Sequence, residues 1–220
     1  GCHPILVDPP LHSCCQLQIQ SHYHVIRVCF ILIAKQQIII VIGDSMAKNI
    51  KPVYYGEYLQ LDKLLDAQHP HSAMYGPEAH DEMLFIIVHQ VYELWFKQVL
   101  HELRSIYREF QQPELADRAL QLVAHRLQRI LTIQDLMNAQ VGVIETMTPQ
   151  EFLEFREYLV PASGFQSIQF KELEILLGLT RQSRITYDQQ SFYNRLHDKD
   201  RAYLEDLEQQ PSLFDGVDQW

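Results

Sequence analysis

The chain has 220 residues, of which 47% are hydrophobic and 21% are charged, a balance that excludes a disordered or low-complexity protein. Its formal net charge is −10 with no basic stretch to offset it, which argues against a nucleic-acid-binding surface. The length favours one or two domains.

The first 45 residues differ in character from the rest. They contain every cysteine of the chain, Cys2, Cys14, Cys15 and Cys29. A remainder without cysteine suits a reducing compartment, so we expect a cytoplasmic protein. Residues 25–42 are β-branched but include Arg27 and Lys35, and they fit neither a membrane span nor a signal peptide well. We expect residues 1–45 to be mistranslated upstream sequence or a fusion. The alternative is a genuine membrane-associating or β-structured extension.

Residues 46–220 have the spacing of helices. Leucines at three-to-four spacing follow Tyr54 and Tyr55, and the segment ends at His69-Pro70-His71. A long helix is predicted over about 81–110, apolar almost all round in its first half. Its second half should place Val99, Leu103, Ile106 and Phe110 inward, and Glu102, Arg104 and Arg108 outward. The next helix should open at Pro113, with a stripe of Leu120, Val123, Leu127, Ile130 and Met137 that suits an antiparallel partner.

Thr148-Pro149-Gln150-Glu151 predicts a capped helix start, with Thr148 as the cap and Glu151 completing a capping box. That helix should carry Phe152, Arg156 and Leu159 on one face. A Ser163-Gly164 turn breaks it, and the glycine there is free to take positive φ. A further helix over 166–177 should end at Gly178. No alternating strand pattern appears after Met46, so we predict an all-α helical bundle.

The usual catalytic and metal signatures are missing. Helical di-iron bundles need paired Glu-x-x-His motifs, and no histidine of this chain has a glutamate three residues before it. The histidines of His69-Pro70-His71 are only two possible ligands, so they are interpreted as a solvated loop.

One constellation remains as a candidate binding site. Phe85 and His89 share a face of the long helix, Phe152 and Arg156 share a face of another, and Ser163-Gly164 follows. Together they could recognise a ligand with an aromatic body, a ring N–H and a carboxylate. The alternatives are a structural core histidine bonded to a backbone carbonyl, and an arginine that extends to solvent along its apolar stem.

Several long motifs resemble the tryptophan 2,3-dioxygenase family. They are Tyr55-Gly-Glu-Tyr-Leu-Gln-Leu-Asp-Lys-Leu-Leu65, His80-Asp-Glu-Met-Leu-Phe-Ile-Ile-Val-His-Gln90, Glu93-Leu-Trp-Phe-Lys97, Glu145-Thr-Met-Thr-Pro149 and Ser163-Gly-Phe-Gln-Ser167. The resemblance covers roughly residues 50–215, with the motifs in order and at family-like spacings. It implies a helical bundle of the haem-dioxygenase type over residues 46–220.

The resemblance also implies an activity and a set of roles. Haem b would bind O2, and both oxygen atoms would enter the indole 2,3-bond of L-tryptophan to give N-formylkynurenine. His89 would be the catalytic histidine that hydrogen-bonds the indole N–H, Phe85 would pack on the indole, and Arg156 would hold the carboxylate. Other substrate-binding residues would be Ile86, Ile87, Val88, Phe152, Leu159 and Ser163. Ser163 and Gly164 would also contact the haem.

The resemblance implies a cytoplasmic homotetramer with exchanged N-terminal segments and no nucleic-acid or membrane partner. Tyr55, Tyr58 and Leu59 would reach into a neighbouring subunit's site. Two residues depart from the family pattern, because Phe152 lacks the phenolic hydroxyl that some members carry and Val88 replaces a glutamine. No histidine here matches the family's axial haem ligand, which is expected beyond Trp220. The chain is therefore expected to be an N-terminal portion, truncated before the axial-ligand helices. The alternative is a non-catalytic helical assembly module of the same family.

Overall fold

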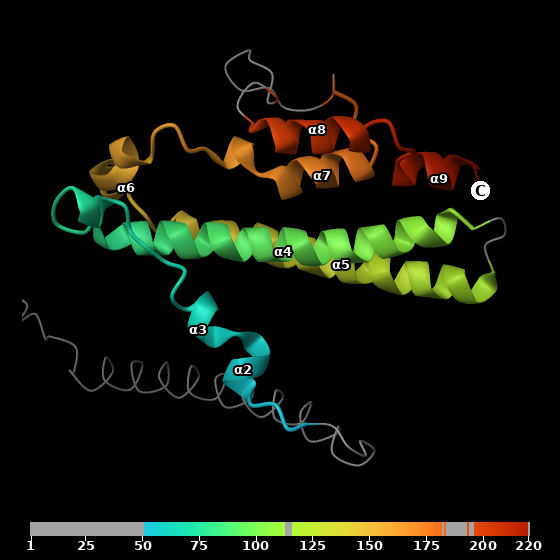
Figure 1. Ribbon diagram of the computed structural model, residues 1–220, viewed down its shortest axis with the longest axis horizontal. Coiled ribbons are helices and arrows are strands. Elements are labelled where there is room, and N and C mark those ends of the chain that lie inside the picture. Colours follow the sequence, from blue (N-terminus) through green and yellow to red (C-terminus); the bar gives the residue numbers. More distant parts are fainter. Residues whose placement is uncertain (1–50, 113–115, 182, 184–192, 194–195, 220) are drawn as a thin grey trace, which may run out of the picture. The chain divides into compact units, whose positions relative to one another are not determined.

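The computed structural model describes residues 51–112, 116–181, 183, 193 and 196–219, and every regular element within these ranges is a helix (Figure 1). The predicted all-α class is confirmed. The chain divides into two compact units, Gly1–Leu61 and Asp62–Trp220. The predictions about residues 1–45 fall outside the described residues.

The described part of the first unit contains one short helix. Helix α2 (Tyr55–Leu59) ends at Gln60, which takes the left-handed conformation with φ of 52°. Every residue of α2 is exposed. Helix α3 (Leu61–Leu64) begins at the boundary between the two units. The leucine stripe expected here is not buried, since Leu64 is 41% exposed and Leu65 is 72% exposed.

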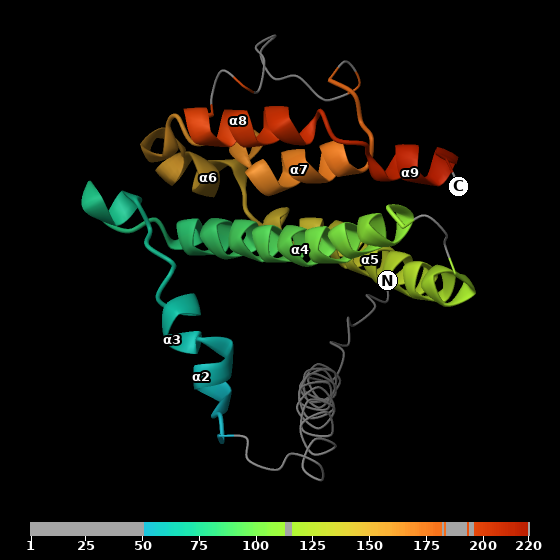
Figure 2. The ribbon, with the colours of Figure 1, turned by 45° about the vertical axis from the view of Figure 1, so that its right-hand side comes forward.

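Two long helices form the frame of the second unit. Helix α4 (His80–Phe110) has 31 residues and α5 (Asp117–Ile144) has 28, and they lie side by side in opposite directions (Figures 1 and 2). The antiparallel arrangement follows from the short connection between them. The prediction that Pro113 opens α5 is wrong, because the helix begins at Asp117 after an extended Ala116. Pro113 itself lies outside the described residues.

The core lies where α4 meets α5 and α7 (Ile168–Leu176). Val99, Leu103 and Ile106 of α4 are buried there, as the helical spacing predicted. Helix α8 (Asp198–Leu207) packs on α7, and α9 (Leu213–Gln219) packs on α4. Gly216 permits the close approach of α9, because a Cβ at that position would lie 3.2 Å from the Phe110 Cβ.

Glu102 was expected to face solvent, and this prediction is wrong. Its side chain is 4% exposed and forms an ion pair with Arg129 of α5, with Nη1 2.6 Å from Oε1. Gln98 donates to the same oxygen at 2.8 Å, and Arg126 Nε lies 3.8 Å from the other oxygen. Glu102 was expected to face outward because it is charged. It instead lies beside the buried Leu103 and faces the arginines of α5.

The capping box at the start of α6 (Pro149–Arg156) is confirmed. The Thr148 hydroxyl accepts from the Glu151 backbone N–H at 3.3 Å, and the Glu151 carboxylate accepts from the Thr148 N–H at 2.6 Å. A 3₁₀ turn, η2 (Glu157–Leu159), follows directly. The α-helix therefore ends at Arg156, and Leu159, three residues later, lies in the η2 turn.

The two glycine predictions have opposite outcomes. Gly178 follows α7 with φ of 90° and is the expected C-terminal glycine. Gly164 was expected to be free to take positive φ, but it does not use that freedom. It opens the 3₁₀ turn η3 (Gly164–Gln166), which Ser163 caps by accepting from the Phe165 N–H at 3.3 Å.

Candidate functional site

A buried carboxylate fixes the start of α4. Glu82 is 1% exposed, and its oxygens accept hydrogen bonds from the backbone N–H groups of His71 and Ser72 at 2.7 and 2.9 Å. Burial alone would raise the pKa of Glu82, but the hydrogen bonds from Ser72 and His71 outweigh it and lower the pKa below its ordinary value. These bonds hold the turn η1 (Ser72–Met74) against the first turn of the helix.

Three phenyl rings join α4 to α6. The Phe85 centroid lies 5.8 Å from that of Phe152 and 5.4 Å from that of Phe155, and the latter two rings are 5.5 Å apart. Phe155 is fully buried, whereas Phe85 and Phe152 are half-buried. We call these three residues the phenylalanine cluster. It brings together two of the residues predicted for the site and adds Phe155, which the sequence analysis missed although it follows Phe152 by three residues.

His89 extends the phenylalanine cluster toward solvent. Its ring is exposed and lies 4.1 Å from the Phe85 ring, tilted by 36°. Its Nδ1 is 2.7 Å from the Phe85 backbone carbonyl oxygen. A carbonyl oxygen can only accept, so Nδ1 carries the proton, and in the neutral ring Nε2 is left as an acceptor. The alternative of a core histidine bonded to a backbone carbonyl is thus correct for the hydrogen bond and wrong for the burial, because the ring is exposed; within the described ranges Nε2 has no hydrogen-bond partner.

The neighbouring residues on α4 point in different directions. Val88 is buried at 8% exposure, Ile86 is half-buried, and Ile87 is 43% exposed. Successive helix residues are about 100° apart, so a contiguous run cannot line one side of a pocket. Phe85 and His89, four residues apart, share the site face. The substrate-binding roles of Ile86, Ile87 and Val88 stay predictions.

Arg156 is the last residue of α6, one helical turn after Phe152. It is half-buried, and among the described residues it forms no ion pair. The following turn η2 is supported by Tyr158, whose ring stacks on Tyr75 at 5.1 Å with an interplanar angle of 5°. Tyr75 belongs to the loop that Glu82 holds. The carboxylate of Glu82 therefore connects the start of α4 to the segment that carries Arg156 and Leu159.

The remaining predicted site residues lie on the turn η3 and in the first unit. Ser163 and Gly164 form the start of η3, with the Ser163 N–H donating to Gln166 Oε1 at 3.0 Å. Tyr55, Tyr58 and Leu59 are exposed on α2 at 56%, 77% and 41%. A large exposed apolar and aromatic surface of this kind is typical of a segment that binds another surface.

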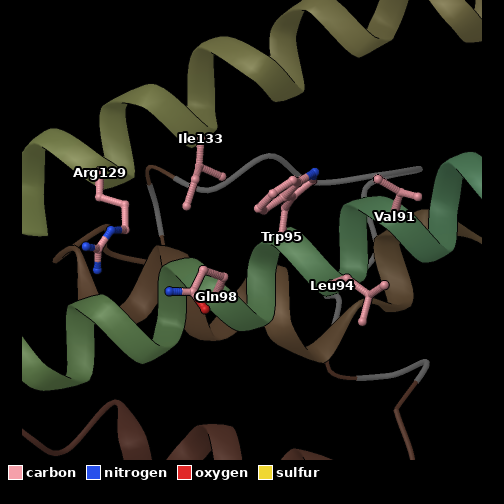
Figure 3. Close-up of a pocket in the computed structure, with 6 residues that line it drawn as sticks. All are labelled: Val91, Leu94, Trp95, Gln98, Arg129 and Ile133. Atoms are coloured by element: carbon pink, nitrogen blue, oxygen red, sulfur yellow. The ribbon is translucent and has the colours of Figure 1, made fainter. Parts of the chain in front are cut away.

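A separate hollow is lined by residues of α4 and α5 (Figure 3). Trp95 projects from α4 toward Ile133 of α5, and Gln98 and Arg129 bound the other end. None of the residues that line it was predicted for the site. Arg129 is engaged by the buried Glu102 described above, so the hollow has a structural ion pair at its edge.

Among the described residues, the phenylalanine cluster and the Ser163–Gly164 turn are the parts that could contact a cofactor such as haem. The phenylalanine cluster supplies an apolar surface, and the Ser163–Gly164 turn supplies small residues beside it in sequence. No group of three or more histidine, cysteine, aspartate or glutamate side chains within the described ranges could hold a metal ion. His197 is exposed at the N-cap of α8, outside the phenylalanine cluster. No helix in these ranges has both the length and the hydropathy to cross a membrane.

Comparison with known proteins identifies the family. Residues 44–220 match the family model described as tryptophan 2,3-dioxygenase. The tryptophan 2,3-dioxygenase of Alteromonas mediterranea is 67% identical over 175 residues, which are 80% of this chain and 48% of that protein. The enzyme of Bdellovibrio bacteriovorus is 50% identical over 169 residues, covering 77% and 47%. That of Dictyostelium discoideum is 48% identical over 170 residues, covering 77% and 42%.

The chain spans about half the length of these curated relatives. The match nevertheless runs through all the described helices, from α2 to α9. The chain belongs to the tryptophan 2,3-dioxygenase family.

Proposed function

We propose that this chain forms the substrate-recognising half of a haem-dependent dioxygenase. The enzyme would insert both atoms of O2 across the indole 2,3-bond of L-tryptophan to give N-formylkynurenine. One observation carries the proposal: the Nε2 acceptor of His89 lies beside the phenylalanine cluster, whose helix α6 ends in an arginine without an ion-pair partner among the described residues.

The indole ring, the indole N–H and the carboxylate of tryptophan each have a matching group in this proposal. The indole ring packs against Phe85, and its N–H donates to His89 Nε2. The planar guanidinium of Arg156 suits the substrate carboxylate, because two N–H groups can donate to its two oxygens. Phe152 contributes a ring without a hydroxyl, so it shapes the pocket through contact alone. Leu159, Ser163, Ile86, Ile87 and Val88 remain proposed lining residues.

Haem b, when bound, would supply the chemistry of O2 activation. Ser163 and Gly164 are the residues of this chain proposed to contact it, because a small turn lets a flat macrocycle approach the backbone. The phenylalanine cluster would exclude water from the reacting side. No described histidine is assigned as the axial ligand.

The proposed assembly is a cytoplasmic homotetramer. The exposed aromatic side chains of Tyr55 and Tyr58, with Leu59, support an exchanged N-terminal segment that completes the site of a neighbouring subunit. A tetramer would bury the apolar surface of these three side chains, whose exposure to water is unfavourable.

Residues 1–45 are proposed to lie outside the enzyme domain. Deleting them should leave the helical signal in circular dichroism unchanged and keep or improve solubility, because residues 25–42 are β-branched, apolar and prone to aggregation. A large loss of cooperative unfolding in the shortened chain would contradict this boundary.

The test of function is tryptophan turnover by this chain co-expressed with the remaining half of the Alteromonas mediterranea relative. We expect the complex to carry haem, seen as a Soret band, and to form N-formylkynurenine. A complex that assembles without binding haem or consuming tryptophan would refute the proposal and favour the alternative, a non-catalytic assembly module.

A further inference from the structure

The loop before α4 contacts the end of α6 through two tyrosines (Figure 1). Tyr75 follows the turn η1, and Tyr158 lies in the turn η2, two residues after Arg156. Their rings are stacked, with centroids 5.1 Å apart and an interplanar angle of 5°. We call this pair the tyrosine stack. Neither tyrosine was predicted for the site, and neither has a role in the function proposed above.

Tyr75 is held within its own loop although its side chain is 63% exposed. Its backbone N–H donates to the Ser72 carbonyl oxygen at 2.9 Å. Ser72 is fixed in turn by the buried carboxylate of Glu82, and its hydroxyl accepts from the Ala79 N–H at 3.0 Å. The His71 ring meets the Tyr75 ring edge-on, with centroids 5.3 Å apart. The tyrosine stack therefore joins the end of α6 to the hydrogen-bonded start of α4.

The end of α6 needs such a support because the α-helix stops there. Arg156 is its last residue, and Val160, just after η2, is already extended with ψ of 131°. The last carbonyl groups of a helix have no partner within it, so its final turn opens more readily than its middle. The residue before Arg156 is Phe155, which is buried in the phenylalanine cluster. Arg156 thus follows one fixed residue, and the tyrosine stack fixes the chain again two residues later.

We propose that the tyrosine stack positions Arg156 for the carboxylate of the substrate. The inference rests on the function proposed above, in which Arg156 binds that carboxylate and His89 accepts from the indole N–H. Both contacts form together only when the end of α6 keeps its place relative to α4, because a bidentate pair of guanidinium and carboxylate has strict geometry. Tyr75 is a positioning residue, which acts through Tyr158 and Arg156 without touching the substrate.

The experiment measures tryptophan affinity by isothermal titration calorimetry, in the chain assembled with the remaining half of the Alteromonas mediterranea relative. Tyr75→Ala removes one ring of the stack, whereas Tyr75→Phe keeps it. The matched control is Met74→Ala, which shortens a side chain that is 73% exposed in the preceding turn and is not part of the stack. Circular dichroism and urea denaturation check that every variant folds.

Tyr75→Ala should raise the dissociation constant for L-tryptophan about 2- to 12-fold. An aromatic pair shifts an equilibrium by about this factor, and affinity falls with the fraction of protein that holds the binding geometry. Tyr75→Phe and Met74→Ala should each change the dissociation constant less than about twofold, because both leave the two rings in place. Tryptamine, which has no carboxylate, should bind the parent and Tyr75→Ala alike.

Two further measurements separate positioning from a general loss of stability. Adding Tyr75→Ala to Arg156→Ala should cause no further loss of tryptophan affinity, because the contact that the stack positions is already gone. In the absence of ligand, Tyr75→Ala should speed hydrogen exchange of the backbone N–H groups of residues 156–160 and leave exchange in α5 unchanged. A general loss of stability would speed exchange in both segments.

Three results would each overturn the inference. In Tyr75→Ala, tryptophan and tryptamine lose affinity equally, the loss persists when Arg156 is already alanine, or hydrogen exchange at residues 156–160 is unchanged. A parent that binds tryptophan as tightly as Tyr75→Ala also overturns it, and leaves the proposed function standing. A parent that does not bind tryptophan refutes the proposed function, and the inference falls with it.

Discussion

Replacing Arg156 tests whether this chain recognises an amino acid. A guanidinium bonded to a carboxylate contributes about 1.5–3 kcal/mol. Arg156 is half-buried and forms no ion pair among the described residues, so in the free protein the substitution breaks no such pair. At about 1.4 kcal/mol per tenfold, Arg156→Ala should weaken L-tryptophan binding by about 10- to 150-fold in the chain assembled with the other half.

One further ligand and two further variants serve as controls for this result. Arg156→Lys should recover only part of the loss, because an ammonium keeps the charge but not the planar pair of donors. Tryptamine lacks the carboxylate, so it should bind the parent weakly and respond little to either change. Arg108→Ala removes the same charge from an exposed position in the last turn of α4 and should leave tryptophan affinity unchanged.

The assay is isothermal titration calorimetry with each ligand against each variant. Equal losses of affinity for tryptophan and tryptamine would refute the reasoning. In that case Arg156 would support its helix through the packing of its apolar stem, which was the alternative from the sequence.

Three further variants test other contacts. His89→Ala should weaken the binding of L-tryptophan about 2- to 12-fold in the same titration, because it removes one neutral hydrogen bond. Binding of the analogue methylated on the indole nitrogen should not change. Equal losses of affinity for the two ligands would contradict the role of Nε2. Thr148→Ala should lower the free energy of unfolding by about 1 kcal/mol through loss of the cap, in contrast to Thr132→Ala, whose hydroxyl bonds only within α5. Glu82→Gln should lower the free energy of unfolding at pH 7, measured by urea denaturation. Because the pKa of Glu82 is lowered in the folded protein, the carboxylate stabilises the fold above its ordinary pKa of 4.5, and this stabilisation is lost as the pH falls through the folded pKa. The free energies of unfolding of the parent and of Glu82→Gln should therefore become equal in acid. A difference that persists at low pH would show that the carboxylate charge is not responsible.

Local signals predicted the parts of the fold that local interactions determine. Thr148 and Glu151 interact with each other's backbone, so four consecutive residues contain the whole helix start. The end of α7 at Gly178 is also a local property, because a glycine, which has no Cβ, takes the left-handed conformation without strain. The pairing of Phe85 with His89 also follows from helical spacing alone.

The errors concern features that depend on a second element. The outward orientation expected for Glu102 ignored Arg126 and Arg129, which approach it from another helix. The two arginines are three residues apart in the sequence, a spacing that places both on one face of α5 and could have indicated a buried acidic partner. Phe155 was missed likewise, because its burial depends on the contact between α4 and α6.

The ion pairs of Glu102 also bear on how α4 and α5 align along their length. Arg126 lies between Glu102 and Glu109, at 3.8 and 3.7 Å from them, and Arg129 binds Glu102 directly. A slip of one helical turn would move the helices by about 5.4 Å and separate these charges. Leucine and valine contacts tolerate such a slip, because similar side chains recur along both helices. A buried carboxylate does not, since it would be left without a partner. We therefore expect Glu102 to select a single register for this long hairpin.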